Sequence, residues 1–388
     1  MKNKILLATV YYQPNYGSIL QAYATQCLVE SLGYEAVTIN CNIINQQAKR
    51  KKILYYLKKI NQKEVFLGQV RRFSLKWKSM VDDSFRVHIG ERRNAFETFR
   101  KERFYLSKSV SLARLNTLCD EKTRAVLVGS DQLWLPSNIA ANFFTLNYVP
   151  EHVKKIAYGT SFGVSRLPKE MEDKAAYFLK RLDFISVREK TGLEIVEKVS
   201  GREAALVCDP TLLLGAQEWI QRMPQERIIE EKYIFCYFLG ANAAHREYAG
   251  KLATKKGCKV VNMPHLDEFV KADEKYANES LYDISPLEFL NLIYHAECIC
   301  TDSFHATIFS IMFHKVFYTF RRFQKTNRAS TNNRIDSLLG LSGLEKQIVE
   351  DCDLYKEINQ NMPDYKRVEM LLGPVREESL QYLCKALE

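Results

Sequence analysis

Asp302, Ser303 and His305 are the residues of this sequence whose types and spacing best suit proton transfer. They lie between an expected buried strand, residues 298–301, and an expected helix, about 306–313. The first turn of a helix favours anions because its N–H groups are unpaired and its dipole is positive. A histidine there can exchange a proton near neutral pH. The simpler interpretation is that Asp302 or Ser303 only caps the helix.

Polar residues also end several other expected strands, which favours a site over a simple cap. These clusters are residues 15–18, 129–132, 160–163 and 188–189. Ligands of α/β proteins bind at the carboxyl ends of parallel strands, in the loops that follow them. We therefore expect these loops to form a binding site.

Basic residues follow the next strand after His305. They are Arg321, Arg322, Lys325, Arg328 and Arg334. If some of them gather beside the His305 helix, an anionic substrate with phosphate or carboxylate groups is expected there. Others are expected to face only water.

Alternating strand and helix patterns must position these residues. A strand at 5–12, a helix capped by Ser18 and a strand at 35–40 form one βαβ unit, typical of a parallel sheet. The second half repeats this order, and Ser285 to Glu288 reads as a capping box. We predict two doubly wound, Rossmann-like α/β domains facing a cleft. The expected ranges are 1–214, with a basic helical insert at about 43–110, and 215–388, with a final helix at about 374–387.

Composition excludes several classes of protein. The 388 residues are 46% hydrophobic and 26% charged, as in soluble globular proteins. No run of 18 apolar residues predicts a transmembrane helix, and the apolar N-terminus reads as a first strand rather than a signal peptide. The ten cysteines are scattered, which favours reduced thiols in the cytoplasm and gives no metal-binding pattern.

One segment accounts for the whole net positive charge of the chain. Residues 43–110 hold 18 Lys and Arg against 6 Asp and Glu, and this surplus of 12 positive charges exceeds the net charge of +10 for the whole chain. The segment is either a solvated helical face or a surface for something anionic, such as phospholipid, a diphosphate-linked substrate or nucleic acid. It matches no nucleic-acid-binding motif, and we expect no nucleic-acid partner.

Common catalytic motifs are missing from the sequence. It contains neither G-x-G-x-x-G nor a P-loop, which disfavours dinucleotide and P-loop chemistry. H-E-x-x-H is also missing, which argues against a catalytic metal.

Six short motifs together resemble the polysaccharide pyruvyl transferase family. In chain order they are NYGSILQAY (15–23), GSDQLW (129–134), SFG (161–163), SVRE (186–189), DPTLL (209–213) and DSFH (302–305). Each is weakly specific alone, but their order is that of the family from residue 5 to about 345. The basic insert and the C-terminal tail carry no motif.

The resemblance implies a two-domain fold similar to GT-B glycosyltransferases and a transferase without a cofactor. Phosphoenolpyruvate would be the donor, and two hydroxyls of a sugar in a cell-surface polysaccharide, exopolysaccharide or capsular, would accept pyruvate as a ketal with release of phosphate. His305 would exchange the proton, and Arg188 would clamp an anionic group.

The donor site departs from one family pattern. Some members carry an arginine two positions before the histidine, where this chain has Ser303. The donor would then be bound by Ser303, Phe304 and a downstream cation, Arg334 or Arg321. The acceptor-binding candidates lie in the N-terminal half and are Asn15, Tyr16, Gly17, Ser18, Asp131 and Gln132.

Three alternatives remain open at this stage. A glycosyltransferase would bind a nucleotide-sugar, a non-catalytic relative would bind sugar or phosphate without turnover, and a nucleic-acid binder would show steeply salt-dependent affinity. We expect a cytoplasmic protein, and we expect the basic segment to hold it at the inner membrane face, close to a lipid-diphosphate-linked acceptor. The sugar, its hydroxyl pair and the oligomeric state are not predicted.

Overall fold

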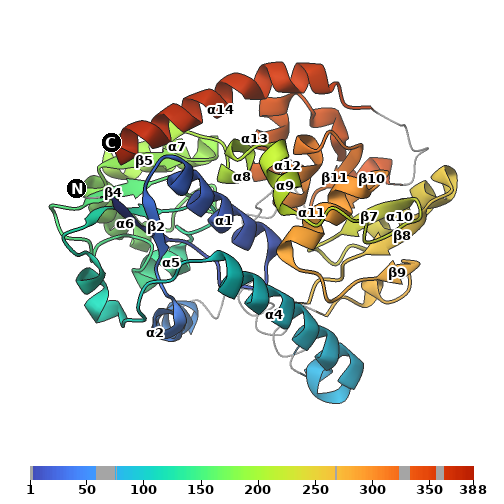
Figure 1. The fold of residues 1–388 in the computed structure, drawn as a ribbon, viewed down its shortest axis with the longest axis horizontal. Coiled ribbons are helices and arrows are strands. Elements are labelled where there is room, and N and C mark those ends of the chain that lie inside the picture. The colour runs from blue at the N-terminus through green and yellow to red at the C-terminus, as the bar shows by residue number, and fades with distance from the viewer. Residues whose placement is uncertain (1–2, 58–74, 76, 267–268, 323–332, 355–361) are drawn as a thin grey trace. The chain divides into compact units, whose positions relative to one another are not determined.

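The computed structural model describes residues 3–57, 75, 77–266, 269–322, 333–354 and 362–388 (Figure 1). The chain forms two compact units. The first contains residues 1–62, 100–214 and 373–388, and the second contains 63–99 and 215–372. The expected domain boundary, between Leu214 and Gly215, coincides with a boundary of these units. Residues 63–99, expected in the N-terminal domain, belong to the second unit, and residues 373–388, expected in the C-terminal domain, belong to the first.

The first unit is built on a parallel six-stranded sheet in the order β2-β1-β3-β4-β5-β6. Its strands are β1 (Lys4–Ala8), β2 (Glu35–Thr38), β3 (Thr123–Val128), β4 (Lys154–Ala157), β5 (Phe184–Val187) and β6 (Ala205–Leu206). Its helices are α1 (Tyr16–Ser31), α2 (Asn42–Leu57), the 3₁₀ turn η1 (Leu112–Leu118), α5 (Pro136–Ala141), α6 (Lys169–Arg181), α7 (Lys190–Ser200) and α8 (Pro210–Leu213).

The second unit has a parallel six-stranded sheet in the order β12-β11-β10-β7-β8-β9. Its strands are β7 (Tyr233–Tyr237), β8 (Lys259–Asn262), β9 (Glu279–Ser280), β10 (Cys298–Thr301), β11 (Phe317–Phe320) and β12 (Ile348–Val349). Its helices are α9 (Ala216–Arg222), α10 (Ala243–Lys256), α11 (Pro286–His295), α12 (Phe304–Met312) and α13 (Asn333–Ser342), with short turns η2 (Lys271–Asp273), η3 (Glu345–Gln347) and η4 (Asp351–Asp353).

Two further helices run across the division between the units. Helix α4 (Asp83–Arg103) crosses it after Phe99, and α14 (Tyr365–Leu387) crosses it after Leu372. Helix α14 contains Pro374, the residue at which this helix was expected to begin. The C-terminal helix therefore begins nine residues earlier than its expected start at residue 374.

The central strands are apolar because both faces of each sheet are covered. All five residues of β7 are buried. Its even-numbered residues join the cluster that contains Tyr248 of α10, whereas Phe235 and Tyr237 pack against Phe289 of α11. Successive side chains of a strand point to opposite faces, so α10 and α11 cover opposite sides of the sheet.

The structure confirms the predicted fold class, since both sheets are parallel and carry α/β connections. The capping box at Ser285 is confirmed as well. The capping role of Ser18 is wrong: Asn15 is the N-cap residue of α1, because its side chain accepts a hydrogen bond from the Ser18 N–H. Of the basic segment, residues 58–74 and 76 lie outside the described residues.

Each sheet has one topological switch point, where the strand order reverses. In the first sheet it lies between β1 and β3, and in the second between β7 and β10. Ligands of open α/β sheets bind beyond the carboxyl ends of the strands at such points. The loops after these four strands are therefore the expected ligand-binding loops.

Within the described part of the chain, no helix combines the length and apolar character needed to cross a bilayer.

Candidate functional site

The first switch point brings together the motifs at 15–18 and 129–132. Ser18, in the first turn of α1, donates its hydroxyl to Asp131 Oδ2 at 2.6 Å. Asp131 follows β3, and the loop before α1 follows β1. Two motifs more than a hundred residues apart therefore meet at one polar contact, as the sequence predicted for loops at the same sheet edge.

The backbone at Asp131 is held in a conformation that non-glycine residues seldom adopt, with φ of 83°. Its carbonyl accepts a hydrogen bond from the Ser161 N–H at 2.8 Å, and Trp134 N–H bonds to the Ser161 carbonyl at 3.0 Å. These bonds fix the loop across β3 and β4. Such conformations cost energy and gather at functional sites.

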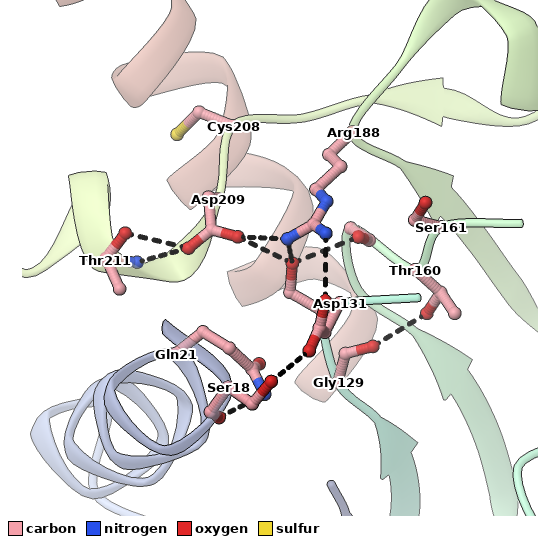
Figure 2. A network of polar contacts seen from close by, with 12 residues as sticks. Ser18, Gln21, Gly129, Asp131, Thr160, Ser161, Arg188, Cys208, Asp209 and Thr211 are labelled. Atoms are coloured by element: carbon pink, nitrogen blue, oxygen red, sulfur yellow. Dashed lines mark hydrogen bonds and ion pairs between the residues drawn. The ribbon is translucent and has the colours of Figure 1, made fainter. Parts of the chain in front are cut away.

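Arg188 links this loop to the end of β6 (Figure 2). Its guanidinium donates to Asp209 Oδ2 at 2.7 Å, to Ser130 Oγ at 3.1 Å and to Asp131 Oδ1 at 3.2 Å. Ser130 also donates to Asp209 Oδ2 at 2.8 Å. Figure 2 shows Asp131 between Arg188 and Ser18, so the arginine holds one carboxylate oxygen and the serine the other.

Exposure separates the members of this network. The side chains of Arg188 and Asp209 are 1% and 0% exposed, whereas that of Asp131 is 15% exposed. Burial disfavours the charged guanidinium, but Asp209, Asp131 and Glu189 outweigh this effect and raise the pKa of Arg188. Arg188 is therefore a buried cation that orients Asp131, and Asp131 is the carboxylate that reaches the surface.

Other polar atoms near this edge are buried without hydrogen-bond partners among the described residues. They include Thr9 Oγ1, just past β1, and Gln132 Nε2. Gly163 packs against the Gln132 amide, and a Cβ there would come within 2.9 Å of Nε2. Buried polar groups in proteins normally have partners, so these atoms favour a ligand with hydroxyl groups.

The remaining acceptor candidates differ in access. Tyr16 is fully buried, and Gly17 is buried within the first turn of α1. Asn15 is partly exposed and caps the helix. The structure thus gives Tyr16 and Gly17 a packing position and leaves Asn15, Asp131 and Gln132 partly exposed, while acceptor binding by all of them stays a prediction.

The second switch point is organised by Asp302. This side chain is 0% exposed and accepts hydrogen bonds from Leu239 N–H at 2.7 Å and Gly240 N–H at 2.8 Å. A Cβ at residue 240 would lie 2.8 Å from Asp302 Oδ2, so a glycine is needed for this approach. Arg322 donates to the Asp302 carbonyl at 3.1 Å. Asp302 thus ties the loop after β7 to the loop after β10.

His305 lies in the first turn of α12, as predicted. Ser303 is the N-cap residue, whose side chain accepts from Ala306 N–H, so the simple capping role also holds for this serine. The His305 ring stands edge-on to Phe304, with centroids 5.2 Å apart. The guanidinium carbon of Arg334 lies 5.4 Å from the centroid of the Phe304 ring. Three of the four predicted donor-binding residues, Ser303, Phe304 and Arg334, therefore gather with His305 at the N-terminus of α12.

Arg321 is placed differently. Its Nη1 donates to both carboxylate oxygens of Asp336, at 2.7 and 2.9 Å, and its Nη2 pairs with Glu350 at 3.3 Å. These carboxylates already neutralise it, so the geometry gives it a structural role, and donor binding by Arg321 stays a prediction. Lys325 and Arg328 lie outside the described residues.

His245 was not singled out from the sequence, although it belongs to the second switch point. It is 1% exposed in α10, close to Asn242 and packed on Phe320 with ring centroids 4.6 Å apart. Burial is the largest influence and lowers its pKa to about 4, although Asp302 acts in the opposite direction. Only its place, three residues after the helix cap Asn242, could have drawn attention to it.

Among the described residues, no group of three His, Cys, Asp or Glu side chains could hold a metal ion. The functional groups at the two switch points are carboxylates, an imidazole and guanidinium groups. They can move protons and bind anions and hydroxyl groups.

Solved structures similar to this chain include three enzymes. The UDP-GlcNAc 2-epimerase of Neisseria meningitidis, bound to UDP-GlcNAc, has a TM-score of 0.48 and 12% identity, covering 98% of this chain and 99% of that one. The UDP-GlcNAc 2-epimerase of Methanocaldococcus jannaschii gives 0.47 and 12%, covering 97% and 100%. The E. coli heptosyltransferase WaaC with ADP gives 0.40 and 12%, covering 96% and 99%.

A comparison with curated protein sequences gave no match. The family model for polysaccharide pyruvyl transferase matches residues 15–322. This range contains all six motifs, the second switch point and the network around Arg188. The chain belongs to the polysaccharide pyruvyl transferase family.

Proposed function

We propose that this protein transfers pyruvate from phosphoenolpyruvate to two hydroxyls of one sugar, forming a cyclic ketal and releasing phosphate. The observation that supports this most is the placement of His305, Ser303 and Arg334 at the switch point of the second sheet. Membership of the family supports the same reaction class. The sugar would belong to a cell-surface polysaccharide or its precursor.

The reaction needs one proton donor and one proton acceptor. A proton added to the methylene carbon of the donor converts it to a methyl group and makes C2 electrophilic. One sugar hydroxyl attacks C2, the bond from C2 to the phosphate oxygen breaks, and the second hydroxyl closes the ring. Of the two hydroxyl protons, one replaces the proton delivered to carbon and the other leaves with phosphate.

We assign the donor to the second unit. His305 would deliver the proton to the methylene carbon, because its imidazole can change charge near neutral pH. Arg334 would bind a carboxylate or phosphate oxygen pair, which a guanidinium does with two parallel hydrogen bonds. Ser303 and the N–H groups of the first turn of α12 would complete the anion site.

We assign the acceptor to the first unit. Asp131 would take the proton from the attacking hydroxyl, because it is the accessible carboxylate of the network around Arg188. Gln132 and Thr9, whose buried polar atoms lack partners among the described residues, would bind neighbouring sugar oxygens. Arg188 would act on the reaction by orienting Asp131.

The acceptor would be linked to a lipid diphosphate, and the protein would lie peripherally at the inner membrane face. The support is the charge of residues 43–110, with 18 Lys and Arg against 6 Asp and Glu. Anionic lipids attract such segments.

The test is acceptor-dependent release of phosphate from phosphoenolpyruvate, measured with hexose and N-acetylhexosamine glycosides. Wild type should release phosphate with at least one acceptor, and His305→Ala should lose the activity. His152→Ala, an exposed histidine of the first unit, serves as the matched control. Binding of a nucleotide-sugar, with no phosphate release from phosphoenolpyruvate in the presence of any acceptor, would contradict the proposal.

A further inference from the structure

Two cavities of the first unit lie beside α2 and share a wall. One, of about 470 Å³, lies between α2, α5 and α6, and the other, of about 560 Å³, between α2, α5 and η1. Lys51, Asn142 and Asn147 line both, and we call the two cavities together the α2 groove. Neither cavity is lined by Asp131 or Gln132, and their volumes are those of small-molecule sites.

The floor of the α2 groove is fixed by polar contacts. Asn142 has φ of 63° and accepts hydrogen bonds from Thr145 Oγ1 at 2.7 Å and Asn147 Nδ2 at 2.8 Å. In the second cavity, Gln47 accepts from Leu112 N–H at 2.8 Å and holds η1 against α2. The groove is therefore built from ordered groups that pack in the folded unit.

The charges along the α2 groove are mainly positive. Arg50 and Lys51 line it from α2, and Lys174 and Asp173 line it from α6. Helix α2 contains no acidic residue. Three cations against one carboxylate favour an anionic ligand.

A buried hydroxyl supports a ligand in the α2 groove. Tyr148 lines the cavity beside η1, and its hydroxyl is buried without a hydrogen-bond partner among the described residues. Burial raises the pKa of Tyr148, which keeps the phenol protonated and able to donate. A buried donor without a partner is uncommon, and an anion oxygen would satisfy it.

The side of α2 that lines the groove becomes apolar toward its C-terminus. Gln47, Lys51 and Leu54 follow one another at i, i+4 and i+7, and therefore share one side of the helix. Leu54 and Leu57 are 61% and 55% exposed. A ligand lying along this side would contact Lys51 and then, one to two helical turns further along α2, the exposed side chains of Leu54 and Leu57.

Helix α5 connects the α2 groove to the acceptor loop. Asn138 Nδ2 donates to the Gln132 carbonyl at 3.0 Å, and Asn142, at the C-cap of the same helix, lines the groove. The six residues of α5 span about 9 Å at 1.5 Å per residue. One extended acceptor could occupy both places.

We propose that the α2 groove binds the diphosphate of a polyprenyl-diphosphate-linked acceptor, with Leu54 and Leu57 against the first part of its lipid. Arg50, Lys51 and the Tyr148 hydroxyl bind the phosphate oxygens. This rests on the proposed function, because it names the class of acceptor that brings the sugar to Asp131.

Co-sedimentation with phosphatidylcholine vesicles that contain undecaprenyl diphosphate tests the proposal without any turnover. Wild type should bind these vesicles more tightly than vesicles with phosphatidylglycerol at equal charge. Lys51→Glu should weaken binding about tenfold or more, because a cationic donor to the phosphate is replaced by an anion. Tyr148→Phe should weaken it about threefold or more, because an uncharged donor is lost. The matched control is Lys49→Glu, an exposed site on the same helix that does not line the groove, with binding within about twofold of wild type.

Three results would overturn the proposal: equal losses in Lys51→Glu and Lys49→Glu, equal binding of both anionic lipids, or no binding to either. Tyr148→Phe guards against a general charge effect, because it changes no charge, and the thermal midpoint of each variant reports folding. The proposed function fails separately, as intact binding without phosphate release from phosphoenolpyruvate.

Discussion

The hydroxyl of Ser18 donates to Asp131 at 2.6 Å, which joins the loops on the two sides of the first switch point. On its other oxygen the same carboxylate accepts from Arg188 at 3.2 Å. Asp131 is thereby fixed by Ser18, from the helix that follows β1, and by Arg188, from the loop that follows β5. A carboxylate held in this way has one orientation toward an incoming hydroxyl, which is a property that a proton acceptor needs.

Asp131→Asn should lower kcat about 10²- to 10⁴-fold, because an amide cannot take the proton of the acceptor hydroxyl. The fold should survive, since asparagine tolerates the positive φ at this position. The measurement is phosphate release at saturating donor and acceptor. Asp83→Asn, an exposed site in α4, is the control for a general charge change. Unchanged kcat would remove Asp131 from the chemistry.

Arg188→Met should destabilise the first unit by about 3–5 kcal/mol, because it leaves the buried carboxylate of Asp209 without its cation. Arg188→Lys should also be destabilising, since an ammonium cannot bond to Asp209, Ser130 and Asp131 in the same geometry. Urea unfolding followed by the fluorescence of the buried Trp134 measures both effects. A double-mutant cycle with Asp209→Asn isolates the pair, and additivity would argue against the coupling.

Arg334→Ala should raise KM for phosphoenolpyruvate about tenfold or more while the fold is kept, because a charge-assisted pair to the donor is lost. Arg334→Lys should recover only part of this, since a lysine bonds as a point charge. Initial rates across a range of donor concentrations give KM and kcat. A change in the acceptor KM alone would contradict donor binding by this residue.

His245 should make the second unit less stable in mild acid. Its folded pKa of about 4 lies below the ordinary value of 6.5, so the unfolded state binds the proton first as pH falls. Stability is therefore complete above about pH 6.5 and declines toward pH 4, by about 3 kcal/mol in all. Urea unfolding at a series of pH values, read from Trp219, measures this decline, and His245→Gln should flatten it. A slope that persists in this variant would assign the effect to other groups.

The regular elements were predictable because their signals are local. The alternation of apolar strands and amphipathic helices gave both parallel sheets, and Ser285 with Glu288 gave a helix start that the structure confirms. Asn15 shows the limit of such signals. Both Asn15 and Ser18 are good capping residues, and only the loop geometry decides between them.

The site was predictable as a set of loops and less so as a set of roles. Sequence order places Arg188 after a strand, as an anion-binding arginine would be, but it cannot show that Asp209 and Asp131 already surround it. The same holds for Arg321, whose partners Asp336 and Glu350 lie 15 and 29 residues away. Burial of His245 depends on the aromatic rings packed around it, which no local pattern records.

Helix α14 returns the chain to the first unit after the second is complete. Tyr382 donates to the Ala157 carbonyl at 3.0 Å, and Ser379 accepts from Cys208 N–H at 2.9 Å. During synthesis these partners emerge long before the helix does, because residues 215–372 come between them. At about 5–20 residues per second the ribosome needs roughly 8–30 s for that stretch. The strands of the first sheet are therefore synthesised long before the last helix that packs on this unit is available.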